Sequence, residues 1–381
     1  MALGLVLAAV AWAQGRVVPA GQLLVARAHH TATRLGDGRV LVVGGASTDG
    51  TTVLASVELF DPKTRRWSQG APLSVGRSKH AATLLDDGRV LVTGGITQVS
   101  SAESSRFVAL PSAELYEPKK NVWTLTQPMA EARGGHTATL LADGSVLVVG
   151  GAREERVNVG VVERFDPKTA RFQPLAPLPT PRADHLAIRL GDGSVVVLGG
   201  HGARGAGPGA SVVLDAVERF VPASQAWQVV PRMSEARQRS AAVAQADEVL
   251  VIGGQTATTS TNLVEAWAPG SPAWSTRGSL SMGLVAHSAT RLDSGDVVVI
   301  GGESPTSVDT SRVQRWRHDT RRWCLGGQLQ VARKGHTATL LPGGRVLVVG
   351  GTSGGLPEAS VELWEDASGR CEEPPSLPIE W

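Results

Sequence analysis

The chain has 381 residues, a formal net charge of +2 and 19% charged residues. So small a net charge creates no field that would attract nucleic acid or an anionic membrane surface. No apolar stretch reaches the roughly 20 residues that span a bilayer. The 45 glycines and 22 prolines indicate many tight turns between short elements, and 42% hydrophobic residues is ordinary for a folded protein. We therefore expect neither a nucleic-acid partner nor a membrane span.

The N-terminus resembles an export signal. A short apolar run at residues 3–10 is followed by Ala11-Trp12-Ala13, which fits an A-x-A cleavage pattern before Gln14. The basic residues that usually precede such a run are missing. We expect residues 1–13 to be a signal peptide and the mature protein to be secreted or periplasmic.

A double glycine recurs seven times along the rest of the chain. The pairs stand at 44–45, 94–95, 150–151, 199–200, 253–254, 301–302 and 350–351. A period near 50 residues that carries several short strands is typical of a propeller.

Each repeat predicts four strands. In the third repeat these are residues 138–141, 146–149 and 161–165, with a fourth strand that ends near 175–179. The Asp143-Gly144 turn between the first two strands suits a two-residue hairpin, whose central positions need positive φ.

Aromatic residues recur at two positions of the repeat, and we expect both columns to fill the wedges between neighbouring sheets. The third-strand column is Phe60, Tyr116, Phe165, Phe220, Trp267, Trp316 and Trp364. The fourth-strand column is Trp67, Trp123, Phe172, Trp227, Trp274 and Trp323, with Cys371 in the seventh repeat.

The sequence DGRVLVVGG, followed by Glu with an aromatic and then by Trp, resembles the kelch motif over roughly residues 17–378. It is particularly similar to the kelch domain of galactose-oxidase-like secreted proteins. The resemblance implies an all-β, seven-bladed kelch β-propeller with four antiparallel strands per blade, its repeats starting near 27, 77, 133, 182, 237, 284 and 333. GQLLVAR at 21–27 matches GQLQVAR at 327–333, so we expect the N-terminal segment, rather than CEEPPSLP at the C-terminus, to complete the last blade.

Two polar columns also repeat. Histidines stand at His30, His80, His136, His185, His287 and His336. A metal site needs three or four convergent ligands, and six histidines spread around a ring predict a structural role and no metal site.

Arginines and glutamates recur together, and the sixth repeat alone lacks both, with Leu284 and Gln314 in their places. We therefore expect partly buried ion pairs within the blades, where removal of one partner would cost several kcal/mol. The pairs are Arg27 with Glu58, Arg77 with Glu114, Arg133 with Glu163, Arg182 with Glu218, Arg237 with Glu265, and Arg333 with Glu362.

The resemblance raises two enzymatic alternatives. Radical-copper oxidases need a tyrosine cross-linked to cysteine, a second tyrosine and two histidines, whereas this chain has one tyrosine, Tyr116, in the core column. We reject that activity and expect no cofactor. A sugar mutarotase or epimerase of the sialic-acid type needs only an acid or base near an arginine, so it stays open as the alternative.

We expect a non-catalytic module that binds a protein or a glycan on one face. In kelch propellers the loops between second and third strands share a face with the segments that join the blades, and ligands usually bind there. Two of these loops are long here, at 96–112 and 201–216. The candidate binding patch in and between them is Arg106, Phe107, Arg153, Arg156, His201 and Arg204.

The two cysteines leave an alternative open. Cys324 follows the Trp position of the sixth repeat and Cys371 occupies it in the seventh. Opposite-facing residues on adjacent blades suit a bridge, but packed sheets lie about 10 Å apart, whereas a disulfide needs Cα atoms within about 7 Å. A bridge or two buried thiols are both compatible with the sequence. We expect a monomer.

Overall fold

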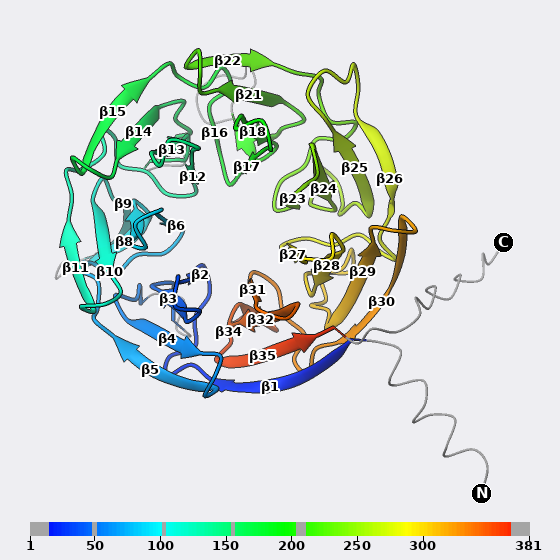
Figure 1. Cartoon of the computed structure of the whole chain (residues 1–381), viewed down its shortest axis with the longest axis horizontal. Coiled ribbons are helices and arrows are strands. Elements are labelled where there is room, and N and C mark those ends of the chain that lie inside the picture. Colours follow the sequence, from blue (N-terminus) through cyan, green and yellow to red (C-terminus); the bar gives the residue numbers. More distant parts are fainter. Residues whose placement is uncertain (1–14, 48–51, 101–103, 154–156, 203–210, 367–381) are drawn as a thin grey trace, which may run out of the picture.

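Seven four-stranded antiparallel sheets stand around a central axis as the blades of a propeller (Figure 1). This count refers to the residues that the computed structural model describes, which are 15–47, 52–100, 104–153, 157–202 and 211–366. None of them forms a helix long and apolar enough to span a membrane. The signal peptide expected at residues 1–13 lies outside the described residues.

The blades are numbered along the chain and their strands run from the axis outward. Blade 1 consists of β2 (Thr31–Arg34), β3 (Val40–Val43), β4 (Val57–Asp61) and β5 (Arg66–Gly70). Blade 2 consists of β6 (Ala81–Leu84), β7 (Val90–Thr93), β10 (Ala113–Glu117) and β11 (Val122–Leu125). Blade 3 consists of β12 (Thr137–Leu140), β13 (Val146–Val149), β14 (Val162–Asp166) and β15 (Arg171–Leu175). Blade 4 consists of β17 (Leu186–Arg189), β18 (Val195–Leu198), β21 (Val217–Val221) and β22 (Ala226–Val229).

The remaining blades follow the same order. Blade 5 consists of β23 (Ala241–Gln245), β24 (Glu248–Ile252), β25 (Leu263–Trp267) and β26 (Ser275–Ser279). Blade 6 consists of β27 (Ser288–Arg291), β28 (Val297–Ile300), β29 (Arg312–Arg317) and β30 (Arg322–Gln328). Blade 7 consists of β31 (Thr337–Leu341), β32 (Arg345–Val349), β35 (Ser360–Glu365) and β1 (Arg16–Gln22).

The N-terminal strand completes blade 7. β1 pairs with β35 in antiparallel register, with Val17 opposite Trp364 and Val18 opposite Leu363. The two ends of the described chain therefore meet at the outer edge of one blade (Figure 1). The ring is closed by strand pairing, as the cleaner N-terminal match suggested.

The second strand of each blade is the centre of the core. All four residues of β3 are fully buried, because both faces of this strand are covered by neighbouring blades. Between blades 1 and 2, Leu41 and Val43 pack with Val90, Val92 and Tyr116. A strand buried on both faces has a continuous apolar sequence instead of an alternating one, which explains the repeated VLVV.

The glycine pairs end these strands where the chain passes close to the segments that join the blades. Gly45 has φ +102°, and a Cβ there would lie 2.7 Å from the carbonyl oxygen of Ala28. Gly350 has φ +58°, and a Cβ there would lie 2.6 Å from the carbonyl oxygen of Arg27. Both the φ angle and the lack of space require glycine, so the repeated double glycine is structural.

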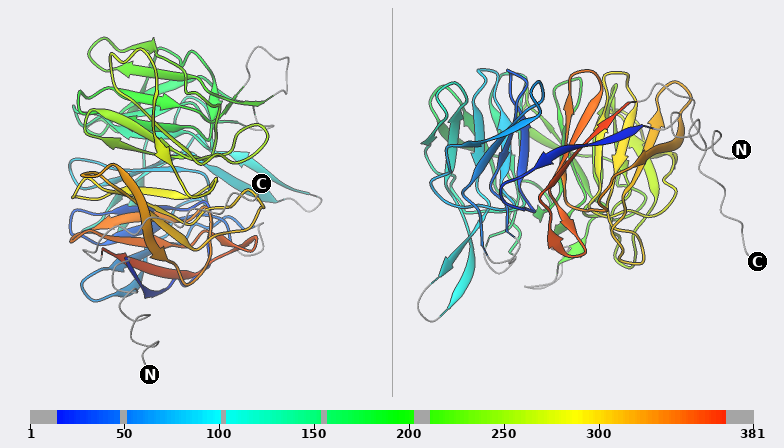
Figure 2. Two further views of the ribbon diagram at one scale, coloured as in Figure 1. Left: turned by 90° about the vertical axis from the view of Figure 1, so that its right-hand side faces the viewer. Right: turned by 90° about the horizontal axis from the view of Figure 1, so that it is seen from below.

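The connections between second and third strands and the segments that join the blades share one face, called here the loop face. The hairpin of β8 (Ile96–Ser100) and β9 (Ser105–Ala109) projects from it above blade 2, and is the cyan element in Figure 2. Above blade 4, β16 (Arg182–Ala183), β19 (His201–Gly202) and β20 (Val212–Val213) form a small sheet. A two-residue pair, β33 (Thr352–Ser353) and β34 (Leu356–Pro357), stands above blade 7.

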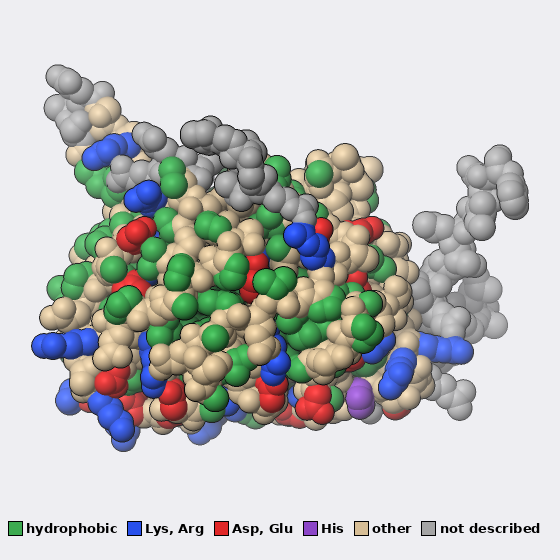
Figure 3. All heavy atoms as spheres, turned by 90° about the horizontal axis from the view of Figure 1, so that it is seen from above, with side chains coloured by type: hydrophobic (Ala, Val, Ile, Leu, Met, Phe, Trp, Pro, Cys, Tyr) green, Lys and Arg blue, Asp and Glu red, His purple; other side chains and the backbone are tan. Residues whose placement is uncertain are grey.

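The opposite face, called here the turn face, carries the hairpin turns and many charged side chains. These lie along the lower edge of the view in Figure 3. Several are paired locally, such as Arg164 with Asp143 at 2.5 Å and Arg89 with Asp87 at 2.7 Å. Exposed pairs of this kind contribute little to stability.

Candidate functional site

The structure brings together each arginine and glutamate expected to pair. Arg27 Nη2 lies 2.5 Å from Glu58 Oε1, and Arg77 Nη2 lies 2.7 Å from Glu114 Oε1. The pairs Arg133–Glu163, Arg182–Glu218, Arg237–Glu265 and Arg333–Glu362 have the same arrangement. All six arginines are fully buried, so the pairs are fully buried where the sequence led us to expect partial burial.

These ion pairs hold the backbone of their own blades. Arg27 Nη1 donates to the carbonyl oxygens of Gly44, at 2.9 Å, and Ser56, at 3.1 Å. Burial lowers the pKa of Arg133 to about 10, so the guanidinium stays charged at neutral pH. The Nη donors and the carboxylate oxygens are used for local structure, whereas the buried Nε of Arg77, Arg133 and Arg237 has no hydrogen-bond partner. All of these groups are enclosed within the blades, so we assign the pairs a structural role.

The six repeated histidines connect neighbouring blades. His80 Nε2 lies 2.9 Å from Thr31 Oγ1 of blade 1, and His185 Nε2 lies 2.9 Å from Thr137 Oγ1 of blade 3. His287 differs, because its Nε2 lies 3.1 Å from the carbonyl oxygen of Ile252. Each ring contacts a different blade boundary, and no three His, Cys, Asp or Glu side chains within the described ranges form a group that could hold a metal ion.

Burial also sets the ionisation of these histidines. It lowers the pKa of His30, His80, His136, His185 and His336 to about 3, and that of His287 to about 4. The neighbouring arginines lower it further in all but His287. The rings are therefore neutral at physiological pH and act as hydrogen-bonding links between blades.

The residue just before each histidine position lies at the mouth of the propeller axis on the loop face. These seven residues, called here the axial mouth, all have φ between 49° and 64°: His29, Lys79, Gly135, Asp184, Arg239, Ala286 and Gly335. Main-chain hydrogen bonds of 2.8–3.2 Å link five of the seven neighbouring pairs, for example from Gly135 N to Lys79 O and from Asp184 N to Gly135 O. The axial mouth thus presents four ionisable side chains on a backbone that is largely held by hydrogen bonds between blades.

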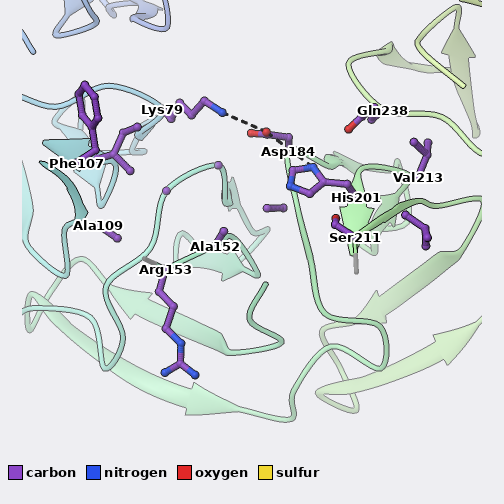
Figure 4. Close-up of a pocket in the computed structure, with 15 residues that line it drawn as sticks. Lys79, Phe107, Ala109, Ala152, Arg153, Asp184, His201, Ser211, Val213 and Gln238 are labelled. Carbon is purple, nitrogen blue, oxygen red and sulfur yellow. Dashed lines mark hydrogen bonds and ion pairs between the residues drawn. The ribbon is translucent and has the colours of Figure 1, made fainter. Parts of the chain in front are cut away.

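An ion pair crosses the axial mouth. Lys79 Nζ of blade 2 lies 3.3 Å from Asp184 Oδ2 of blade 4, and His201 Nδ1 lies 3.9 Å from the same oxygen (Figure 4). Gly135 lies beneath the pair, and a Cβ there would be 2.6 Å from Asp184 Oδ1. The small residue therefore makes room for the carboxylate.

The side chain of His29 is exposed at this mouth, but neighbouring residues shift its pKa. Burial lowers its pKa, and the positive charges of Lys79 and Arg239 act in the same direction, against that of Asp184. His29 is therefore neutral at physiological pH, and Lys79 and Arg239 give the axial mouth two cationic side chains against the single carboxylate of Asp184.

A cavity of about 600 Å³ adjoins the axial mouth above blade 3. Lys79, Asp184 and His201 lie together in this cavity, and Phe107 and Arg153 line it at a distance from them (Figure 4). We call this cavity the blade-3 groove. Its volume falls within the usual range for small-ligand sites, roughly 300–1,000 Å³.

The expected binding patch is thus assembled in part. Phe107, Arg153 and His201 share the groove. Arg106 does not line it, because adjacent residues of a strand point to opposite faces, and Phe107 and Ala109 occupy the groove side of β9. Arg156 and Arg204 lie outside the described residues. Lys79 and Asp184 were not among the expected site residues. The sequence feature that could have indicated them is that the residue just before each repeated histidine varies from blade to blade.

The aromatic columns and the cysteines lie away from this site. Phe60 and Trp67 pack with ring centroids 5.1 Å apart, and Tyr116 and Trp123 at 4.8 Å. Cys324 is buried on β30 and is not free. Cys371 lies outside the described residues, so the bridge between the two stays a prediction.

Comparisons with known proteins agree with this architecture. Residues 26–74 match the kelch motif family. A solved structure described as a fungal alcohol oxidase of the AA5 family in complex with copper superposes with a TM-score of 0.70 at 18% identity, over 92% of this chain and 76% of that one. The chain is a kelch-repeat β-propeller.

A second kelch-like neighbour is the structure of YjhT, with a TM-score of 0.61 and 16% identity over 81% of this chain and 99% of that one. Identities this low carry the fold alone. No curated protein matches the sequence.

The residues of this kelch propeller do not fit the copper–radical site that the resemblance implies. Its single tyrosine, Tyr116, is fully buried in the wedge between blades 1 and 2, and its hydroxyl donates to Asn121 Oδ1 at 2.9 Å. The axial mouth offers a lysine, an arginine, an aspartate and one histidine. The tyrosine that such a centre needs therefore lies between two blades and not at the axial mouth.

Proposed function

We propose that this kelch propeller is an exported, monomeric, non-catalytic module that binds a protein partner on its loop face. One observation carries the proposal. Six of the eleven large apolar side chains that are exposed among the described residues stand in the second-to-third-strand loops: Val99, Phe107, Val157, Val212, Val308 and Leu356. Two of them, Phe107 and Val212, line the blade-3 groove together, and exposed apolar side chains that lie together favour a protein interface.

A glycan partner is less well supported. Sugar sites commonly offer aromatic rings for stacking and several free polar groups, whereas Phe107 is the single exposed aromatic side chain among the described residues of the loop face. The Asp184 carboxylate is already engaged by Lys79. A protein partner supplies apolar side chains of its own and therefore suits this face better.

The mutarotase alternative has one observation in its favour. His29, Lys79, Asp184 and Arg239 place acid–base groups and an arginine at the axial mouth. The groove beside them is open, however, and in Figure 4 Arg153 extends away from the Lys79–Asp184 pair. Exchange between the anomers of a sialic acid, followed by NMR with and without protein, tests this alternative directly; faster exchange would establish it.

The binding function is tested with a shortened loop. Replacing residues 98–107 by a Gly-Ser turn removes the tip of the hairpin but keeps Leu110, whose carbonyl oxygen accepts from Arg133 N. Immobilised wild type should retain a protein from cell-surface extracts that the shortened variant loses at least tenfold, while a glycan array stays unbound. The matched control is Lys63→Ser on the turn face. Equal retention by both loop forms, or retention on the glycan array, would contradict the proposal.

A further inference from the structure

The blade-3 groove lies where one blade has a short loop between two neighbours with longer ones. Above blade 3 the ladder consists of single bridges, Gly134 to Ala152 and Ala152 to Asn158. Above blade 2 the corresponding ladder extends through five paired residues of β8 and β9, and above blade 4 through β16, β19 and β20. The groove therefore occupies the space that a longer loop of blade 3 would fill.

Two facing ladders form the walls of this groove. On blade 2, Ile96 pairs with Ala109 and Gln98 with Phe107, so these four side chains share a face of the hairpin. On blade 4, Ala183 pairs with His201 and His201 with Val213. The walls are mainly apolar and are held by hydrogen-bonded strands.

The floor of the groove has almost no side chains. It consists of Gly134, Gly135 and Ala152. A guest can therefore bring its own backbone close to the floor, as long as its side chains project toward the walls. This arrangement suits an extended polypeptide better than a compact polar molecule.

The charges at the two ends of the groove differ. At the inner end Lys79 and Asp184 neutralise each other. Toward the outside Arg153 is exposed, and its guanidinium has no hydrogen-bond or ion-pair partner in the described part of the chain; Figure 4 shows it turned away from the inner pair. A guest with an acidic residue near Arg153 would supply a charge-assisted hydrogen bond.

We propose, building on the protein-binding function above, that the blade-3 groove takes an extended segment of the partner. The segment places an apolar side chain against Phe107 and an acidic side chain at Arg153. Phe107 is 51% exposed, so burying it against the guest removes apolar surface from water. The groove thus supplies one apolar and one charged contact, and their spacing along the guest gives sequence preference.

The test uses linear random 12-residue peptides displayed on phage and selected against the whole protein. We expect enrichment of sequences that carry an aliphatic or aromatic residue followed within a few positions by Asp or Glu. Synthetic copies of the selected peptides should bind Phe107→Ser and Arg153→Ser at least tenfold more weakly than wild type, and Arg153→Lys should recover part of the loss. Both side chains are solvent-exposed, so the variants should fold like wild type.

The matched control separates this site from the wider loop face. Leu356, 64% exposed above blade 7, is an equally apolar residue outside the groove. Leu356→Ser should leave peptide affinity within twofold. Peptides that depend on Leu356 but not on Phe107 or Arg153 would overturn the groove and leave the loop-face function intact. No enrichment of peptides while the extract partner is still retained would also overturn the groove; loss of both would contradict the two proposals together.

Discussion

Blade 6 lacks the buried arginine–glutamate ion pair that the other six blades have. In blade 3, Glu163 accepts from Ala130 N at 2.9 Å and also pairs with Arg133. In blade 6, Gln314 accepts from Ser281 N at 2.8 Å, whereas Leu284 takes the place of the arginine. The side chain on the third strand therefore has two roles, and only the hydrogen bond to the joining segment is kept in every blade. The two charged residues occur together: six blades have both the arginine and the glutamate, and blade 6 has neither.

Replacing the arginine of blade 3 by the leucine found in blade 6 should have the largest effect on stability. Arg133→Leu leaves the Glu163 carboxylate buried without its cation, and we expect a loss of about 3–5 kcal/mol in the free energy of unfolding. Adding Glu163→Gln to that variant should recover a substantial part of the loss, because the uncharged amide keeps the bond to Ala130 N. Urea unfolding of both variants measures this, with the exposed Arg66→Leu as control. Equal losses in the single and the double variant would show that the buried charge is not the cause.

The cysteine of blade 6 provides the second comparison. If Cys324 is bridged to Cys371, denatured but unreduced protein should contain no titratable thiol and two after reduction. Reduction, or Cys371→Ser, should then lower the free energy of unfolding by about 2–4 kcal/mol. Two thiols without reductant would end the prediction.

Placing charge in blade 6 should have an intermediate effect. Gln314→Glu alone puts a carboxylate beside Leu284 with no cation, and we expect a cost on the order of 1–3 kcal/mol. The loss should be greatest at neutral pH and smaller in acid, where the group is protonated. The double variant Leu284→Arg with Gln314→Glu should return toward wild type. A double variant less stable than the single one would mean that blade 6 has no room for the pair.

The histidine links predict a smaller, pH-dependent effect. The pKa of His185 is about 3 in the fold and about 6.5 when unfolded, so this ring is neutral in the fold and takes up a proton on unfolding in acid. Its contribution to stability is complete above about pH 6.5 and is lost as the pH falls toward 3.

His185→Ser copies Ser240, the residue at this position in blade 5. It should reduce the slope of unfolding free energy against pH by up to about 1.4 kcal/mol per pH unit below pH 6.5. It should also cost about 1 kcal/mol at neutral pH, through the lost hydrogen bond to Thr137. Urea unfolding between pH 3.5 and 8 measures both, with His318→Ser on the turn face as control. An unchanged acid slope would contradict the interpretation.

Much of this fold could be predicted from the sequence because each blade has the same turns, buried strands and packing contacts, and so requires the same residue types at the same positions. The double glycines, the aromatic columns and the joint absence of Arg and Glu at Leu284 and Gln314 each repeat in phase. The site was harder to predict, because it consists of positions that vary. Lys79 and Asp184 are far apart in sequence and meet only because Gly135, in the blade between them, lacks a side chain.

Two features of the side chains were not contained in the repeat pattern. Arg106 and Phe107 were grouped because they are neighbours in sequence, whereas strand pleating turns only Phe107 toward the groove. The ion pairs were expected to be partly buried and are fully buried, because the sequence does not show how closely the glycine-ended strands approach the arginines. Both features concern side-chain direction and distance.

The pairing of β1 with β35 has a consequence for biosynthesis. Arg16 lies opposite Glu365, so β1, the first of the described propeller strands to be synthesised, can pair with its neighbour only after β35, the last of them, has been made. Until then one sheet lacks its outer strand, and a lone strand with unmet hydrogen bonds is open to wrong partners. A circular permutant that joins the native ends and opens the chain between two other blades would keep every sheet contiguous in sequence, and should give a higher yield of correctly folded protein.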